Sequence, residues 1–354
     1  MLALSYLADK RAAAWTVHGA GKTRGPREEN MRRLLAGLLA AVAIVSAPVA
    51  RAQQTLILGG SDAIGSVIDR ANAMFTNLVN ERAGGKLKIN FIQGEQLGTD
   101  MQVIEQMMRG SVHVYGDVLD WYANWVKDLS VLAWGFTFRD MDHMAKFLES
   151  DTYKAYEEEL RVKQGIRVLA KAPAQPRVLF IKKPVASAAD LADVKMRVPE
   201  IRTYLLLWQT LGTKPARVAW GEVFLGLKTG VIDAAEGPVL SAFAAKFHQA
   251  APVVVRTDHV IAAHQISIND KAFQALPPDQ QKILVDAAQE AMTWVRKQSE
   301  QEIDEVYKKM EVDGAKVITV DKATFAQKAL SGVETMEKEG VWSPGLYAKI
   351  QAVR

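Results

Sequence analysis

The chain has 354 residues and no cysteine, so disulfides, thiolate metal sites and a cysteine nucleophile are excluded. Its formal net charge of +4 comes from the start of the chain: residues 1–52 hold eight lysines and arginines and three acidic residues, which leaves 36 basic and 37 acidic side chains in the rest. With that balance we expect no nucleic-acid partner, because no excess of basic side chains remains to attract phosphate groups.

A secretory signal peptide is predicted over residues 31–52. Two arginines follow Met31, an apolar run extends from Leu34 to Val45, and the small-x-small sequence Ala50-Arg51-Ala52 forms a cleavage site. The run is shorter than the roughly 20 apolar residues that span a bilayer. We therefore expect cleavage near Ala52 and a mature protein in the periplasm. Residues 1–30 have no periodic apolar pattern and are interpreted as a non-native upstream extension.

The first half of the mature chain alternates between strand and helix patterns. Apolar or alternating runs predict strands over residues 55–60, 86–92 and 112–117. Helical spacing predicts a helix that ends at Gly84-Gly85, and a second helix that ends at Gly110. This order of elements is typical of a parallel α/β sheet.

The same alternation begins again in the second half. Strands are expected over residues 166–172, 177–184, 194–199, 232–237 and 263–269, and helices over residues 201–212 and 222–229. A helix from Pro277 to about Met310 would be near 50 Å long at about 1.5 Å per residue, so we expect it to lie across two domains. The chain has no low-complexity linker, and strands that cross between the domains are therefore expected to join them.

Motifs for nucleophilic, metal or nucleotide chemistry are absent from the sequence. It contains no G-x-S-x-G, H-E-x-x-H, P-loop or G-x-G-x-x-G pattern, and its histidines show no paired ligand spacing. Two arginines in apolar settings remain: Arg197 in "KMRVP" and Arg177 in "RVLFI". An arginine on a strand usually forms an exposed salt bridge, but a guanidinium is also suited to gripping a carboxylate through two hydrogen bonds. Trp121, Trp125, Trp208 and Trp220 could form the walls of such a site or belong to the core.

One long stretch of the sequence resembles a known family. The stretch "LADVKMRVPEIRTYLLLWQTLGTKPARVAWGEVFLGLKTGVIDAAEGP" is similar to the signature of the solute-binding proteins of TRAP (tripartite ATP-independent periplasmic) transporters. That signature has K-[IL]-R-V-P, a helix ending in L-G, an aromatic residue before S-E-V-Y, then L-Q-T-G and V-D-G-Q-E-N-P. "GEQLGTDMQVIEQMMRGSVHV" and "NDKAFQALPPDQQKILVDAAQEA" also resemble the family.

The resemblance implies an α/β two-domain periplasmic binding-protein fold that closes on an organic acid. Mostly parallel sheets flanked by helices, and a long hinge-spanning helix, belong to that fold. The expected domains are residues 53–174 with 263–302, and residues 175–262 with 303–354. The membrane partners would be the small and large permease subunits of the transporter, and we expect a monomer with no cofactor and no bound metal.

The resemblance also implies roles for individual residues. Arg197 matches the arginine that pairs with the ligand carboxylate, and Arg177 matches the second arginine of the family. Asp117 matches an acidic position that ends the third strand, and Trp220 matches an aromatic lid. The turn Glu236-Gly237-Pro238 would form the wall opposite Trp220. Trp208 and Trp121 are expected as further walls because they are aromatic, not because they match the family.

Three departures from the signature bear on the ligand. Gly237, Ala235 and Phe224 stand where the family has asparagine, glutamine and tyrosine. A hydroxylated ligand in a closed cleft needs many partners, because each unsatisfied buried polar group costs roughly 1–3 kcal/mol. These positions therefore favour a mono- or dicarboxylate with an apolar or aromatic body over a ligand like sialic acid.

Three functions remain open from the sequence. The first is a periplasmic binding protein that delivers a carboxylate to a membrane permease. The second is an exported two-domain α/β enzyme, a hydrolase or isomerase, because a fold alone does not decide function. The third is a ligand sensor that presents its closed form to a receptor kinase. Paired arginines without any nucleophile–base set favour the first.

Overall fold

The computed structural model describes residues 53–354, so the predicted signal peptide and upstream extension lie outside the described residues. The strands are β1 (Gln54–Gly59), β2 (Leu87–Ile92), β3 (Val114–Val118), β4 (Ile166–Ile181), β5 (Lys195–Val198), β6 (Lys214–Arg217), β7 (Ala234–Pro238), β8 (Val253–Asn269) and β9 (Lys316–Thr319). The α-helices are α2 (Val67–Arg82), α3 (Asp100–Arg109), α4 (Met141–Leu148), α5 (Asp151–Gln164), α6 (Arg202–Thr210), α7 (Val223–Thr229), α8 (Val239–Ala244), α9 (Phe247–Ala250), α10 (Asp270–Gln274), α11 (Pro278–Val312), α12 (Ala323–Leu330), α13 (Val333–Lys338) and α14 (Leu346–Gln351). Short 3-10 helices are η1 (Leu119–Asn124), η2 (Lys127–Ala133), η3 (Ala188–Leu191) and η4 (Trp220–Glu222).

Local sequence signals explain where the first helices begin and end. At the start of α2, the Asp69 backbone N–H donates a hydrogen bond of 3.1 Å to the Ser66 hydroxyl oxygen. At the start of α3, the Thr99 backbone N–H donates to the Gln102 side-chain oxygen at 3.0 Å. Gly110 ends α3 at a φ of +82°, in the left-handed region that glycine adopts without strain. The predicted strands and helices of residues 55–117 are confirmed.

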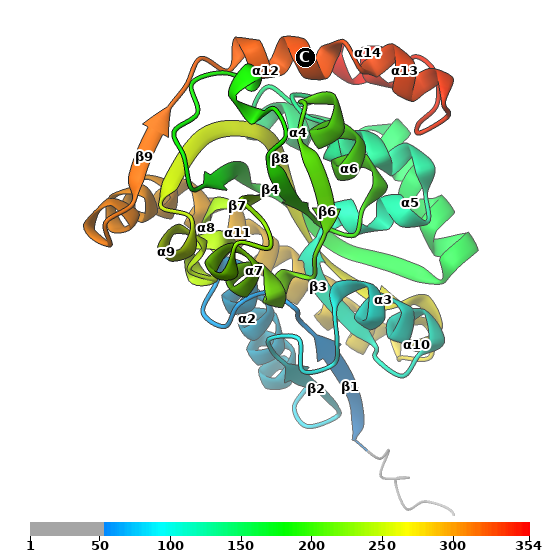
Figure 1. Cartoon of the computed structure of the whole chain (residues 1–354). Coiled ribbons are helices and arrows are strands. Elements are labelled where there is room, and N and C mark those ends of the chain that lie inside the picture. Colours follow the sequence, from blue (N-terminus) through cyan, green and yellow to red (C-terminus); the bar gives the residue numbers. More distant parts are fainter. Residues whose placement is uncertain (1–52) are drawn as a thin grey trace, which may run out of the picture. The chain divides into compact units, whose positions relative to one another are not determined.

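The described strands form one mixed sheet with the order β2-β1-β3-β8-β4-β7-β5-β6, and β9 pairs with β8. β1 is parallel to β2 and β3, and β5 is parallel to β6 and β7. Between these two groups lies the long antiparallel pair of β4 and β8, to which β7 and β3 also pair antiparallel. In Figure 1, β1–β3 gather at one end of this pair, and β6 and β7 lie toward the other. The α/β class and the two-domain fold are confirmed, whereas the exact domain boundaries stay a prediction.

The two central strands are longer than the sequence indicates. The prediction of separate strands over residues 166–172 and 177–184 is wrong, because the structure has the single strand β4 there. β4 continues past Pro173 because its pairing with β8 shifts register between Pro173 and Gln175. Such a bulge accommodates a residue that has no N–H to donate. The strand predicted over residues 263–269 is likewise only the second half of β8.

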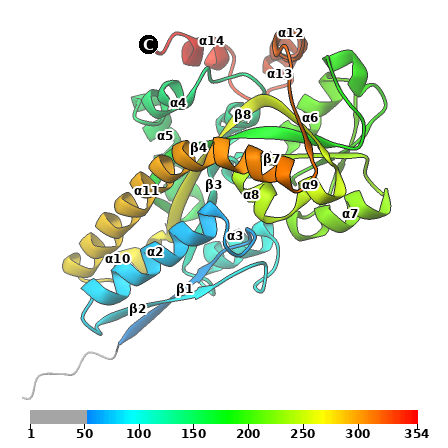
Figure 2. The same cartoon turned by 90° about the vertical axis from the view of Figure 1, so that its left-hand side faces the viewer.

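The long helix α11 packs on the central strands β4 and β8 and on one helix from each half of the chain. It has 35 residues and packs on β4, on α2 and on α8 (Figure 2). Its buried face includes Leu284, Ala288 and Val295, which recur at helical spacing. An ion pair of 2.6 Å between Arg70 and Glu302 also ties α2 to α11. Within residues 53–354, no helix has both the length and the apolar character that crossing a membrane requires.

Candidate functional site

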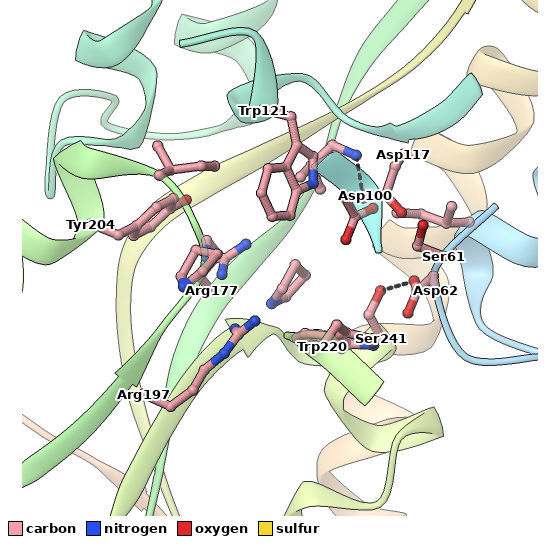
Figure 3. Close-up of a pocket in the computed structure, with 15 residues that line it drawn as sticks. Ser61, Asp62, Asp100, Asp117, Trp121, Arg177, Arg197, Tyr204, Trp220 and Ser241 are labelled. Atoms are coloured by element: carbon pink, nitrogen blue, oxygen red, sulfur yellow. Dashed lines mark hydrogen bonds between the residues drawn. The ribbon is translucent and has the colours of Figure 1, made fainter. Parts of the chain in front are cut away.

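A cavity lies at the carboxyl ends of β1, β3, β5 and β7, and the space in it that protein atoms do not fill, counted with the open solvent at its mouth, is about 440 Å³ (Figure 3). β1 and β3 are parallel neighbours in one half of the sheet, and β5 and β7 are parallel neighbours in the other. Ligands of open α/β sheets bind in the crevice outside the carboxyl ends of parallel strands. The strand directions therefore bring residues from both halves of the chain to one site.

Arg197 is the least satisfied charged group of this cavity. Its side chain lies on β5, is 1% exposed, and donates from Nε to the Val218 carbonyl oxygen at 2.9 Å. Nη1 is buried without a hydrogen-bond partner, and among residues 53–354 no carboxylate forms an ion pair with this arginine. Burial lowers the pKa of Arg197 to about 10, so the guanidinium is still charged at neutral pH. The site thus contains a buried cation, on a side chain that lines the cavity, with one donor that has no partner among the described residues.

Arg177 lines the same cavity but is already paired. Its Nε and Nη2 each donate to the Glu236 carboxylate at 2.6 Å, and both side chains are buried. His259 Nε2 lies 3.2 Å from the same carboxylate. Burial alone would raise the pKa of Glu236, but the Arg177 charge lowers it to about 2. Arg177 lies within β4 and is 3% exposed, so it does not sit at the start of a strand as the sequence indicates.

Trp220 covers one side of the cavity, against the backbone of β7. The Arg197 guanidinium lies 5.4 Å from the centre of the Trp220 ring, within the range of a cation–π interaction. A Cβ atom at Gly237 would lie 3.0 Å from Cη2 and Cζ3 of this ring. A side chain at this position would require the indole to shift by a few tenths of an ångström. Gly237 therefore allows Trp220 to pack closely against β7, although Gly237 does not itself line the cavity.

Three carboxyl groups face the cavity from the side opposite the arginines: Asp117, at the end of β3, Asp62 and Asp100 (Figure 3). Of these three, only Asp117 was predicted from the sequence. Asp62 follows β1 by three residues, and a carboxyl-end position on a parallel strand could have drawn attention to it. Asp100 is the first residue of α3, where an acidic side chain is common for helix stability alone.

The remaining predicted residues divide between the cavity and the core. Trp121 lines the cavity, whereas Glu236 and Trp208 do not. Trp208 is fully buried and packs edge-on against His259 at 5.1 Å between ring centres.

The departures at Phe224 and Ala235 do not affect the lining either, because neither residue reaches this cavity. Its polar groups come instead from segments that the sequence argument did not consider, including Ser61 and Ser241. The three departures from the signature therefore do not favour an apolar ligand body. Within residues 53–354, no group of three or more histidine, aspartate or glutamate side chains is arranged to hold a metal ion.

The comparisons with known proteins agree with this geometry. The family model "bacterial extracellular solute-binding protein, family 7" matches residues 61–339. A solute-binding protein of Roseobacter denitrificans is 27% identical over 301 residues, which cover 84% of this chain and 92% of that protein.

Two solved structures of TRAP periplasmic solute-binding proteins are similar in fold as well as in sequence. The protein from Ochrobacterium anthropi, with bound L-fuconate, has a TM-score of 0.79 and 28% identity, and the match covers 85% of this chain and 99% of that one. The protein from Actinobacillus succinogenes, with bound L-galactonate, has a TM-score of 0.79 and 27% identity, over 84% and 98% of the two chains.

Proposed function

This chain belongs to family 7 of the bacterial extracellular solute-binding proteins, and we propose that Arg197 holds the carboxylate of one small organic acid in the cavity between β3 and β5. The observation that supports this most directly is the buried guanidinium itself. Nη1 has no hydrogen-bond partner among the described residues, and the buried Glu236 carboxylate is already bound by Arg177. A ligand carboxylate would supply the missing acceptor and the missing negative charge in one step.

The other cavity residues then have separate tasks. Arg177 adds positive charge to the same wall, but its paired hydrogen bonds with Glu236 make its main contribution structural. Trp220 and Trp121 close two sides of the cavity and exclude water from the ion pair. Exclusion of water strengthens an ionic hydrogen bond because the effective dielectric constant falls.

Capture requires the cavity to open and close, and we propose a hinge motion along β4 and β8. Hydrogen bonds between the two halves surround the cavity: the Ser241 hydroxyl donates to Asp62 at 2.6 Å, and the Tyr204 hydroxyl donates to Asp120 at 2.7 Å. The Gly221 backbone N–H also donates to Glu95 at 3.2 Å. An open form would exchange these bonds for water, and a ligand that bridges the halves would favour the closed form.

Both solved structures named above are of periplasmic TRAP proteins with a bound sugar acid. We propose by analogy that this chain acts in the periplasm and releases its ligand to TRAP permease subunits. The alternative, an exported hydrolase or isomerase, predicts a ligand that changes chemically in the cavity. Recovery of the bound acid therefore separates the two functions.

A thermal-shift screen against organic acids tests the proposed function. A ligand at 100 times its dissociation constant adds about 2.7 kcal/mol to the free energy of unfolding, which is several degrees for a protein of this size. We expect sugar acids or related carboxylates to stabilise the exported protein, and mass spectrometry to recover them unchanged. The absence of stabilisation by any carboxylate, or conversion of the ligand, would contradict the proposal.

A further inference from the structure

The wall opposite Arg197 contains three carboxyl groups and no basic side chain. Asp62, Asp100 and Asp117 are 6%, 5% and 8% exposed, and they come from three separate segments of the first half of the chain. Among the described residues, none of the three forms an ion pair with a lysine, arginine or histidine. The cavity is therefore polarised, with a free cation at one end and unpaired acids at the other.

Neutral donors already satisfy part of each carboxyl group. The Tyr115 hydroxyl donates to Asp100 Oδ1 at 2.6 Å, and the Ser241 hydroxyl donates to Asp62 Oδ2 at 2.6 Å. The Val118 backbone N–H donates to Asp117 Oδ1 at 2.6 Å. Among the described residues, the Oδ2 atoms of Asp100 and Asp117 accept no hydrogen bond. They remain as acceptors beside the cavity, so a bound molecule must offer donors to them.

A second carboxylate at this end would meet like charge. Two unit charges 4 Å apart repel by about 4 kcal/mol at an effective dielectric constant of 20. A hydroxyl group at the same place would instead donate to a carboxylate oxygen, as Tyr115 and Ser241 do from within the protein. The buried, unpartnered Nη1 of Arg197 fixes the orientation, because it draws the ligand's carboxylate to the opposite end.

From this arrangement we infer that Asp62, Asp100 and Asp117 select a monocarboxylate whose far end carries hydroxyl groups, and that they reject dicarboxylates of the same length. The inference rests on the proposed function, since it requires the ligand's carboxylate to bind at Arg197. Burial raises the pKa of Asp100 to about 6 and that of Asp117 well above its ordinary value, so these carboxyl groups retain protons more readily than exposed aspartates do. A hydroxyl group beside them needs no additional proton, whereas a second carboxylate avoids repulsion there only if a further proton is taken up.

Two sets of matched acids test the inference, in which the dicarboxylate differs from the hydroxy monoacid only at the far end and the plain acid lacks every hydroxyl group. For six carbons these are L-galactonate, galactarate and hexanoate, and for four carbons they are D-erythronate, meso-tartrate and butyrate. We expect calorimetry on the exported protein to show that, in at least one series, the hydroxy monoacid binds at least tenfold more tightly than both the dicarboxylate and the plain acid. A tenfold difference corresponds to 1.4 kcal/mol.

Substitutions identify the residues responsible. Asp100→Asn keeps the size of the side chain and an acceptor for Tyr115 but removes the negative charge, so it should reduce the preference over the dicarboxylate at least threefold. Asp304→Asn, with an 80% exposed side chain on α11, is the matched control and should leave the preference unchanged. If Asp100→Asn does not fold, the inference is decided by the unaltered protein alone, from the ratio of its affinities for the hydroxy monoacid and the dicarboxylate.

Failure of the two proposals would look different. If the dicarboxylate binds as tightly as the hydroxy monoacid and Arg197→Lys weakens both, the selectivity inference is overturned and the proposed function stands. If none of these acids or other carboxylates binds, both are overturned.

Discussion

The two arginines of the cavity should respond to substitution in opposite directions. Arg197 is a buried cation without a counter-ion among residues 53–354, whereas Arg177 is half of a buried ion pair. Replacement of each by methionine removes the charge and keeps much of the volume. We expect Arg197→Met to leave the ligand-free protein as stable as before, or more stable, and Arg177→Met to destabilise it.

The expected change in folding free energy for Arg197→Met follows from the pKa of Arg197. A pKa lowered from 12.5 to about 10 corresponds to on the order of 3 kcal/mol of lost folding free energy. That cost is complete below the folded pKa, where the group is charged in both states, so it is fully present at pH 7. Loss of the Val218 hydrogen bond costs about 1 kcal/mol, and loss of the contact with Trp220 costs a similar amount. The expected net gain is about 1 kcal/mol, or roughly 2 °C in Tm.

Arg177→Met leaves the Glu236 carboxylate buried without its main partner. Removal of one member of a buried ion pair typically lowers the free energy of unfolding by about 3–5 kcal/mol. The Tm of the Arg177→Met protein should therefore fall by several degrees. Thermal unfolding without ligand, followed by calorimetric titration of a stabilising acid, measures both effects. Arg197→Met should abolish binding at micromolar ligand, and Arg197→Lys, which keeps the charge but loses the planar fork, should weaken it at least tenfold.

Two results would refute this reasoning. If Arg197→Met unfolds more than 5 °C below the unaltered protein, the guanidinium is satisfied in the empty cavity and is not waiting for a ligand carboxylate. If Arg197→Met binds the acid within threefold of the unaltered protein, the carboxylate binds elsewhere.

Further predictions concern export, closure and pH. The mature N-terminus should lie within a few residues of Gln53, and N-terminal sequencing of periplasmic protein that begins upstream of Met31 would contradict this. Small-angle scattering should show a smaller radius of gyration after ligand addition, and an unchanged curve at saturation would argue against a hinge. Glu95→Ala removes the bond from Gly221 without touching the cavity lining, so it should weaken binding about fivefold, in line with about 1 kcal/mol for one hydrogen bond; unaltered affinity would exclude a role in closure. Burial raises the pKa of Asp120 to about 6, so its contribution to stability is complete below about pH 4 and is lost as the pH rises through 6. Asp120→Asn should remove up to about 3 kcal/mol of this decline in denaturant unfolding between pH 4 and 7, and a decline equal to that of the unaltered protein would show that Asp120 is not its source.

The sequence by itself determined the class of the fold and most of its elements. Periodicity and capping residues are local, so the strand at residues 55–60, the helix that ends at Gly110 and the long helix from Pro277 could all be predicted. The family resemblance added roles for Arg197, Arg177, Trp220 and Asp117, and Trp121 was a candidate as an aromatic wall; the structure places all five around one cavity. These inferences share a cause, because each depends on a short stretch of neighbouring residues.

Only the tertiary structure decided which charged side chains have an ion-pair partner and which have none. Arg177 and Arg197 look alike in sequence, but β4 pairs with β7 and brings Glu236 opposite Leu179, within reach of Arg177, whereas no carboxylate is paired with Arg197 among the described residues. Asp62 and Asp100 resemble an ordinary loop residue and an ordinary helix start until the sheet brings them beside Asp117. Gly237 looks like the loss of a polar group, yet it makes room for the ring of Trp220. Pairing, burial and close approach depend on residues distant in the chain, and local pattern contains no information about that distance.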